Sequence, residues 1–428
     1  MSKHYFKNYN FENTVLSFQT YNDEFTPELY DDFDSKSKQM HLQTKIDDLF
    51  AGKKVNISEN QAALHPKYRD EYSKHINELQ HYEIFKSAVN VITIGIGGSF
   101  EGPKLLIENE GKTQVNYIFI TGSDPEEFRE KTSCLRPNET IFIVSSKSFT
   151  TEETLDNLQK AITWSKDMSK FIAVTANKSE AQKYNFENII EFDKEIGGRY
   201  SIWTDISLAA HFENKKDLKE KFIQGGKQAD TDLLKDNNYF NFVKSLAFSD
   251  IWHHNFNNKN SRVVLSYIWK FRSLPDYFQQ LEMESLGKQP SKESHFKKTG
   301  QLIFGGYGPK AQHSYFQLLH QGTQDICADI IASNDDKTCL SYAQAITQSQ
   351  LLSNGANDFL KKEETINGNV PLNLFLLKNV DSFTLGYLIA TWEHRTFISS
   401  VMLDINPFDQ FGVNAGKIYT KKYLAKKN

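Results

Sequence analysis

The sequence predicts an α/β protein with two domains, each a mainly parallel sheet flanked by helices. The chain has 428 residues, of which 39% are hydrophobic, so it can bury more than one core. It contains two series of short, apolar, β-rich runs, separated within each series by segments of helix length. Runs this apolar are typical of parallel strands that helices cover on both faces, and right-handed crossovers should connect them.

Four regions follow from these patterns. Residues 1–80 are predicted to be a helical extension, because they lack an alternating strand pattern and contain a helical one from Met40 to Phe50. A first α/β domain is predicted over 81–235 and a second over 245–380, and a helix from about Asp381 to Met402 should open the region 381–428. The expected strands begin near Val89, Tyr117, Ile141 and Phe171 in the first domain, and near Val263, Leu302, Ile326 and Leu372 in the second.

Composition excludes several classes of protein. The chain has 50 Lys and Arg against 54 Asp and Glu, so its net charge of −4 gives no electrostatic reason to expect nucleic acid or an anionic membrane as a partner. The cysteines, Cys134, Cys327 and Cys339, are odd in number and lack CxxC spacing, which argues against a disulfide framework and a structural zinc site. The N-terminus is polar, and no apolar run approaches the roughly 18 residues that span a bilayer, so we expect a soluble cytoplasmic protein.

Two polar motifs directly follow predicted strands of the first domain. Gly95–Ser99 could bring backbone N–H groups to an anion or sugar hydroxyls, although a plain strand-to-helix turn is an equal alternative. Neither the dinucleotide fingerprint, which needs glycine at Phe100, nor a P-loop fits it. In Ser145–Thr151, six of seven residues are Ser, Thr or Lys, more than a helix cap needs, which favours a phosphate site over capping.

Three further motifs carry candidate catalytic residues. Arg199 follows two glycines and could face a developing oxyanion. Glu282 and Glu284 are two residues apart in a helical context, so they should point in different directions, one a possible base and the other solvated. His313 and His320 are seven residues apart without a third ligand, so no metal site is expected, and a structural role is the usual alternative for each.

The motifs together resemble the glucose-6-phosphate isomerase family, in that family's order across roughly residues 90–417. The segments that carry the resemblance are IGIGGS, VSSKSFTTEET, IGGRYSIW, QQLEMES, AQHSYFQLLHQGT and DINPFDQFGVNAGK. The chain resembles a compact bacterial-type member. It departs from the family pattern at Phe100-Glu101, Leu286 and Asn414, and it has Gln61 in place of an arginine upstream.

The resemblance implies two sugar-isomerase (SIS-type) domains and a homodimer whose active sites lie at the junction of domains and subunits, completed by residues 381–428. It implies reversible interconversion of glucose 6-phosphate and fructose 6-phosphate, a reaction of glycolysis and gluconeogenesis, with no cofactor and no metal. A dual phosphoglucose/phosphomannose isomerase and a non-catalytic sugar-phosphate sensor are the alternatives.

The resemblance also implies a role for each motif residue. Glu284 corresponds to the general base and Arg199 to the group beside the enediolate. His313, donated by the partner subunit, and Lys417 correspond to the groups that open the sugar ring. The remaining correspondences are a phosphate cradle of Ser146, Lys147, Ser148 and Thr151, and a sugar site lined by Gly97, Gly98, Ser99, Gln280 and Gln410.

Overall fold

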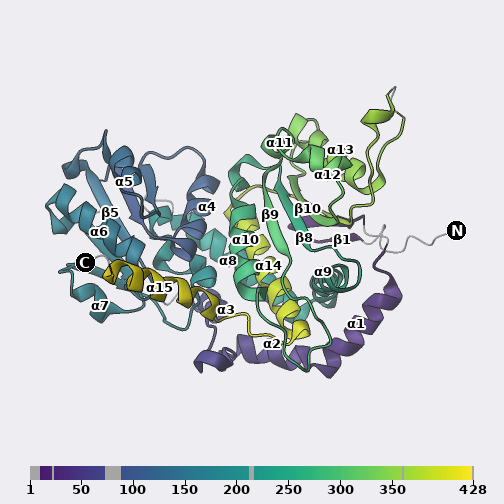
Figure 1. Cartoon of the computed structure of the whole chain (residues 1–428), viewed down its shortest axis with the longest axis horizontal. Coiled ribbons are helices and arrows are strands. Elements are labelled where there is room, and N and C mark those ends of the chain that lie inside the picture. The colour runs from purple at the N-terminus through teal and green to yellow at the C-terminus, as the bar shows by residue number, and fades with distance from the viewer. Residues whose placement is uncertain (1–9, 22–23, 73–87, 212–215, 359–360, 427–428) are drawn as a thin grey trace.

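The structure is a computed structural model that describes residues 10–21, 24–72, 88–211, 216–358 and 361–426. Figure 1 shows two groups of strands side by side, with helices packed around and between them. The predicted boundary at residues 80–81 lies outside the described residues.

The first sheet has the strand order β4-β3-β5-β6-β7, and all its neighbouring strands are parallel. Because chain order reverses between β3 and β5, a crevice opens at the carboxyl ends of these two strands, where ligands bind in folds of this kind. The strands are β3 (Asn90–Ile94), β4 (Asn116–Ile120), β5 (Thr140–Ser145), β6 (Phe171–Thr175) and β7 (Asn188–Glu191). The helices around them are α4 (Glu101–Glu110), α5 (Pro125–Thr132), α6 (Glu152–Ser165) and α7 (Lys178–Gln182).

The second sheet has the order β1-β2-β11-β10-β8-β9, in which the neighbouring pairs among β8 to β11 are parallel. Each apolar run expected from the sequence is a strand, so the predicted fold class is confirmed. The strands are β8 (Ser261–Ser266), β9 (Leu302–Tyr307), β10 (Ile326–Ser333) and β11 (Leu372–Leu377). The helices that follow them are α10 (Leu274–Leu286), α11 (Gly308–Ala311), α12 (Phe316–Gln321) and α13 (Leu340–Asn354).

The N-terminal region differs from the purely helical extension that we expected. Helices α1 (Pro27–Gln39), α2 (Leu42–Phe50) and α3 (His65–Asp70) follow two strands, β1 (Asn10–Glu12) and β2 (Leu16–Thr20). Strand β2 pairs antiparallel with β11 and extends the second sheet. Alternate residues of β2 are buried, but its five residues gave too short a pattern, and its partner lies more than 350 residues away.

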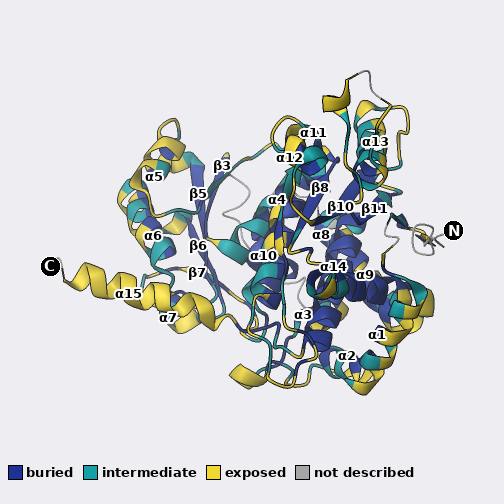
Figure 2. Cartoon of the chain, turned by 45° about the vertical axis from the view of Figure 1, so that its right-hand side comes forward, coloured by how far each residue is buried: buried dark blue, intermediate teal, exposed yellow. Residues whose placement is uncertain are grey.

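Helix α14 (Ser382–Leu403), predicted from the sequence, is buried along almost its whole length (Figure 2). It packs against α8 (Lys216–Lys235) and α9 (Asn237–Phe256). Glycine allows the closest approach, because a Cβ atom on Gly386 would lie only 1.9 Å from the carbonyl oxygen of Phe222 in α8. Helix α14 therefore forms the centre of the larger hydrophobic core and leads directly into residues 404–410.

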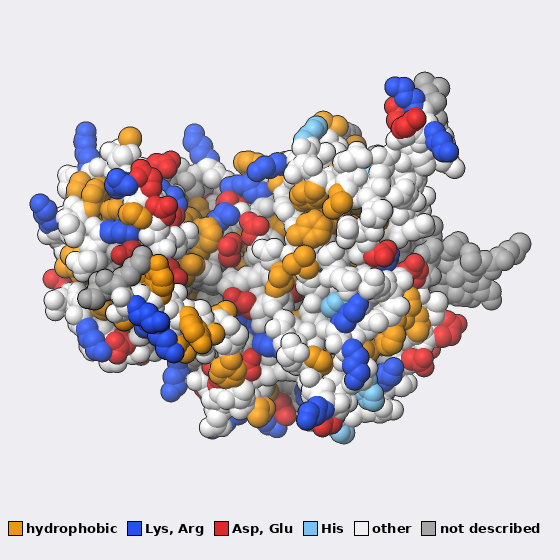
Figure 3. Space-filling view, viewed as in Figure 1, with side chains coloured by type: hydrophobic (Ala, Val, Ile, Leu, Met, Phe, Trp, Pro, Cys, Tyr) orange, Lys and Arg blue, Asp and Glu red, His pale blue; other side chains and the backbone are white. Residues whose placement is uncertain are grey.

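The visible surface carries both signs of charge. In Figure 3, basic and acidic side chains are interspersed, with no broad area of one sign on the face shown. Among the helices of the described ranges, none combines the length and the apolar character needed to cross a bilayer. The last helix, α15 (Asn414–Ala425), is exposed along its length.

Candidate active site

The glycine turn after β3 meets the loop after β5 at the crevice of the first sheet. A Cβ atom on Gly95 would lie 3.1 Å from the carbonyl oxygen of Ser145, so the two segments are in contact. Gly97 has a φ angle of +59°, which favours glycine, and a Cβ on Gly98 would lie 1.9 Å from the carbonyl oxygen of Gly198. This close approach brings the 3₁₀ helix Gly198–Trp203, which carries Arg199, against the turn.

The hydroxyl-rich loop is folded into a compact cradle at the start of α6. The hydroxyls of Ser146 and Thr151 are 3.2 Å apart, those of Ser148 and Thr150 are 2.7 Å apart, and the N–H of Phe149 donates to Ser146 Oγ. Thr151 precedes α6, but its side chain makes no capping hydrogen bond. The capping alternative therefore does not account for Thr151, and N–H groups of the first turn remain able to bind an anion.

Lys147 adds positive charge to this cradle. Its side chain is half-buried, and burial is the main reason why the pKa of its ammonium group is lowered; Glu59 opposes that shift, whereas the nearby Arg199 adds to it. Lys147 and Arg199 thus place two positive charges near the cradle, and such charges can attract an anionic ligand.

Arg199 is fixed by hydrogen bonds to two different segments, α10 and residues 407–410. Its Nε donates to Ser285 Oγ at 2.7 Å, and its Nη2 donates to the carbonyl oxygens of Pro407 and Asp409. Its Nη1 donates to Glu284 Oε2 and to Gln410 Oε1, both at 3.3 Å. The side chain is only 2% exposed, so the guanidinium is a rigid, buried positive charge.

Glu284 lies on α10 with its carboxylate between Arg199 and Gln280. Gln280 Nε2, one helical turn earlier, donates to Glu284 Oε1 at 3.1 Å. The Glu284 side chain is 32% exposed, so a ligand in the crevice can reach it. Within the described chain, Gln280 Oε1 is buried without a hydrogen-bond partner, which leaves an acceptor for a ligand hydroxyl.

Glu282 is not the solvated carboxylate that we expected. It is 5% exposed, forms an ion pair with Arg262, and accepts a hydrogen bond from Trp392 Nε1 at 2.9 Å. The expected divergence of the two carboxylates is confirmed, because Glu284 faces the crevice and Glu282 faces the core. The prediction of solvation was wrong, because Arg262 is far from Glu282 in the sequence and compensates its charge inside the core.

The departure from the family pattern at Phe100-Glu101 lies behind the glycine turn. Phe100 packs edge-on against Phe119, with ring centroids 5.5 Å apart. Glu101 opens α4; burial raises the pKa of its carboxyl to about 7, and in the described structure its Oε2 has no hydrogen-bond partner. The substitution therefore changes the wall behind the turn and leaves Gly97 and Gly98 in contact with Gln280 and Gly198.

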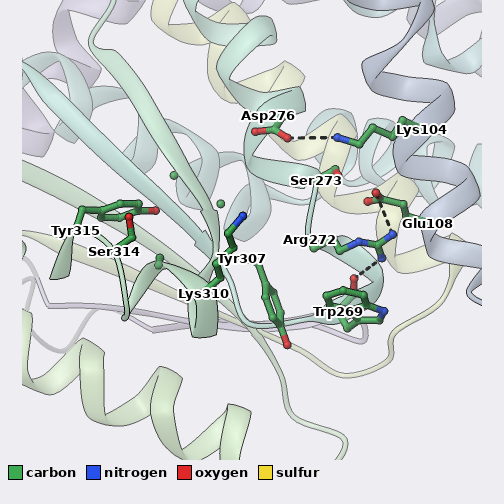
Figure 4. Close-up of a pocket in the computed structure, with 13 residues that line it drawn as sticks. Lys104, Glu108, Trp269, Arg272, Ser273, Asp276, Tyr307, Lys310, Ser314 and Tyr315 are labelled. Carbon is green, nitrogen blue, oxygen red and sulfur yellow. Dashed lines mark hydrogen bonds and ion pairs between the residues drawn. The ribbon is translucent and has the colours of Figure 1, made fainter. Parts of the chain in front are cut away.

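His313 lies outside this cluster. It is exposed after α11, and in the described part of the chain it has no hydrogen bond or ion pair with Glu284 or Arg199. Its neighbours Ala311 and Ser314 line a different cavity, of about 570 Å³, at the end of β9 (Figure 4). Two ion pairs lie in the lining of that cavity, Lys104 with Asp276 at 3.6 Å and Arg272 with Glu108 at 3.0 Å.

Lys417 is also outside the cluster. It is exposed on α15, which Figure 1 shows crossing the first domain near α7. Lys421, four residues later on the same helical face, forms a 3.2 Å ion pair with Glu152, the first residue of α6. Helix α15 therefore reaches the start of the helix that follows the hydroxyl-rich cradle.

The remaining candidate histidine, His320, has a structural contact. His320 is half-buried, and its Nε2 lies 2.9 Å from Gln348 Oε1. Sequence reasoning also overlooked Ser285 and the carbonyl groups of residues 407 and 409, which hold Arg199. Backbone acceptors leave no residue-type signal, so only the fold could reveal them.

Comparisons with known proteins bear on the family and the fold of the chain. Residues 79–428 match the model of a family described as phosphoglucose isomerase. A glucose-6-phosphate isomerase of Shewanella sp. (strain MR-4) is 33% identical, with 94% of this chain and 86% of the relative covered; one of Legionella pneumophila (strain Paris) is 34% identical, with 89% and 83% covered. The fold matches the crystal structure of a glucose-6-phosphate isomerase from Chlamydia trachomatis with a TM-score of 0.88 at 23% identity, covering 98% of this chain and 90% of that one.

Proposed function

Since the chain belongs to the phosphoglucose isomerase family, we propose that Glu284 is the base of its reaction. That reaction is the interconversion of glucose 6-phosphate and fructose 6-phosphate, a step of glycolysis, so the protein is an aldose–ketose isomerase. The observation that carries the proposal is the carboxylate of Glu284, held by Gln280 and Arg199 beside a polar phosphate cradle.

The proposed chemistry is a proton transfer through an enediolate. Glu284 takes the proton from C2 of the open-chain sugar, the C1–C2 double bond forms, and negative charge develops on the C1 oxygen. The C2 hydroxyl proton passes to the C1 oxygen, Glu284 returns a proton to C1, and the C2 oxygen becomes the carbonyl, so one carboxylate serves both carbon proton transfers. Arg199 stabilises the enediolate charge without transferring a proton, because a guanidinium stays protonated.

The substrate phosphate is proposed to bind in the cradle of Ser146, Lys147, Ser148 and Thr151, and the sugar beside Ser99, Gln280 and Gln410. The cluster of hydroxyls, the half-buried ammonium group and the free acceptor of Gln280 support this orientation. With the phosphate held at the start of α6, this orientation would place C1 and C2 of the sugar near Glu284.

Ser146→Ala and Thr151→Ala should each raise KM for fructose 6-phosphate by roughly tenfold or more, because a hydrogen bond to a charged group contributes about 1.5–3 kcal/mol. The cradle holds the phosphate in ground and transition states alike, so kcat should change much less. Thr163→Ala, at the far end of α6, is the matched control. Unchanged KM in both cradle variants would place the phosphate elsewhere.

We propose that His313 and Lys417 act in opening the sugar ring, with His313 supplied by the partner subunit of a homodimer. The exposure of His313, away from the Glu284 of its own chain, supports donation to another copy. The proximity of α15 to the first turn of α6 supports a role for Lys417 close to the cradle. We also propose the cytoplasm as the compartment, consistent with three free cysteines.

A mixing experiment tests whether the site is shared. When Glu284→Gln and His313→Ala proteins exchange subunits, each hybrid dimer should contain one site with both lesions and one with neither. Half of the dimers are hybrids after random exchange, so activity should recover to roughly a quarter of wild type by two-fold symmetry. If both parents are inactive, a tagged subunit demonstrates exchange and the mixture stays inactive, His313 acts within its own chain.

A further inference from the structure

Lys288 joins the helix that carries Glu284 to the segment that holds Arg199. It lies just after α10, and its ammonium group donates to the carbonyl oxygens of Glu284 at 2.9 Å and Ser285 at 3.3 Å. It also donates to the carbonyl oxygens of Asn406 at 3.2 Å and Asp409 at 2.8 Å, and lies 3.3 Å from Asp409 Oδ1. One half-buried cation thus connects two segments that are more than 115 residues apart.

The same segment is bound by Arg199. The Asp409 carbonyl oxygen accepts hydrogen bonds from both Arg199 and Lys288. The side-chain carboxylate of Asp409 is also bound: Ser58 Oγ donates to its Oδ2 at 2.7 Å, and Asn406 Nδ2 donates to the same oxygen at 3.0 Å. Residues 406–409 are therefore held from several directions, and Lys288, like Arg199, links them to α10.

We propose that Lys288 is a positioning residue for the Glu284–Arg199 pair, an inference that rests on the proposed function. Lys288 donates to the backbone of Glu284, and its effect on the carboxylate has two sources. It fixes the last turn of α10 against residues 406–409, and its charge offsets the negative carbonyl end of the helix. Without this charge, the negative end of the helix beside Glu284 would lack its compensating cation.

The charged groups around the pair define the expected pH effect. The cations that interact with Glu284 are Arg199, from the 3₁₀ helix, and Lys288, from the end of α10. Asp409, from the segment after α14, compensates Lys288, and Lys147, from the loop after β5, interacts with Arg199. Removal of the Lys288 charge leaves the Asp409 carboxylate uncompensated beside the Glu284–Arg199 pair, so activity that depends on this pair should need a higher pH.

The test is the pH dependence of kcat/KM in Lys288→Met, Lys288→Gln and Lys288→Arg, with Lys292→Met, an exposed lysine of the same loop, as control. In the Met and Gln variants we expect kcat to fall by about tenfold, KM to stay within about twofold, and the acid limb to move upward by roughly half a pH unit or more. Lys288→Arg should return the acid limb toward wild type, and Lys292→Met should leave both parameters unchanged.

Two outcomes would overturn the inference. One is an acid limb that stays in place in both neutral variants while Tm falls, which would show a structural role only; if Lys288→Met does not fold, Lys288→Gln decides. The other is an equal shift in Lys288→Arg, which retains the charge. Glu284→Gln separates this inference from the proposed function, because an active Glu284→Gln enzyme refutes the base itself.

Discussion

Glu284→Gln is expected to lower kcat by roughly 10²- to 10⁴-fold, the range for loss of a positioned general base. The amide has the shape of the carboxylate but cannot accept the C2 proton. Arg199 keeps its contacts with Ser285, Pro407 and Asp409, so the crevice should stay assembled and KM should change little. Steady-state kinetics in both directions of the reaction measure kcat and KM, and thermal melting of the same preparation shows whether the variant is folded.

Glu293→Gln is a suitable control for this experiment, because Glu293 is exposed in the loop after α10 and contributes nothing to the proposed site. Its kcat should match that of the wild type. Turnover near the wild-type value in purified Glu284→Gln would show that another group removes the proton.

The second large effect is expected in stability, for Arg262→Met. Arg262 is 1% exposed and forms ion pairs with Asp250, Glu282 and Asp329, at 2.5 Å for Asp250 and 3.3 Å for Asp329. Loss of this guanidinium would leave Arg395 as the partner of Asp250 and Asp329, and Glu282 with its hydrogen bond from Trp392. An uncompensated buried charge of this kind costs about 3–5 kcal/mol, so denaturant unfolding should show a loss of that size.

Arg136→Met provides the comparison. Arg136 pairs with Glu139 at 3.4 Å, but its side chain is 76% exposed, so the pair contributes about 0–1 kcal/mol. A loss below 1 kcal/mol for Arg262→Met as well would mean that the carboxylates of its network are neutral in the folded protein.

The fold could be predicted from the sequence because each buried parallel strand corresponds to a continuous run of apolar residues. Ile141–Val144 illustrates this, since all six residues of β5 are buried. Strand β7, with only one fully buried residue, and the short β1 and β2 escaped notice because their patterns are brief. Their pairing depends on partners elsewhere in the chain, and local periodicity cannot reveal such partners.

The candidate site also combines features that local sequence motifs reveal with features that depend on long-range contacts. Motifs that combine glycines or hydroxyls directly after a strand were readable from the sequence, and the structure gathers Gly97, Gly98, Arg199 and Glu284 at one crevice. Long-range contacts were not readable. Glu282 was expected in solvent because its partner Arg262 comes from a different element, strand β8, and Lys288 gave no signal because its acceptors are backbone carbonyls.

The measurement that tests the central claim most directly is deuterium incorporation during conversion of glucose 6-phosphate in D₂O, with the fructose 6-phosphate trapped as it forms. A proton held on the Glu284 carboxyl can exchange with solvent at the enediolate stage, because that side chain is partly exposed. Proton transfer by Glu284 predicts deuterium at C1 of the product, in an amount that increases with temperature. Product without deuterium at every temperature would indicate direct hydride transfer and would contradict the proposed role of Glu284.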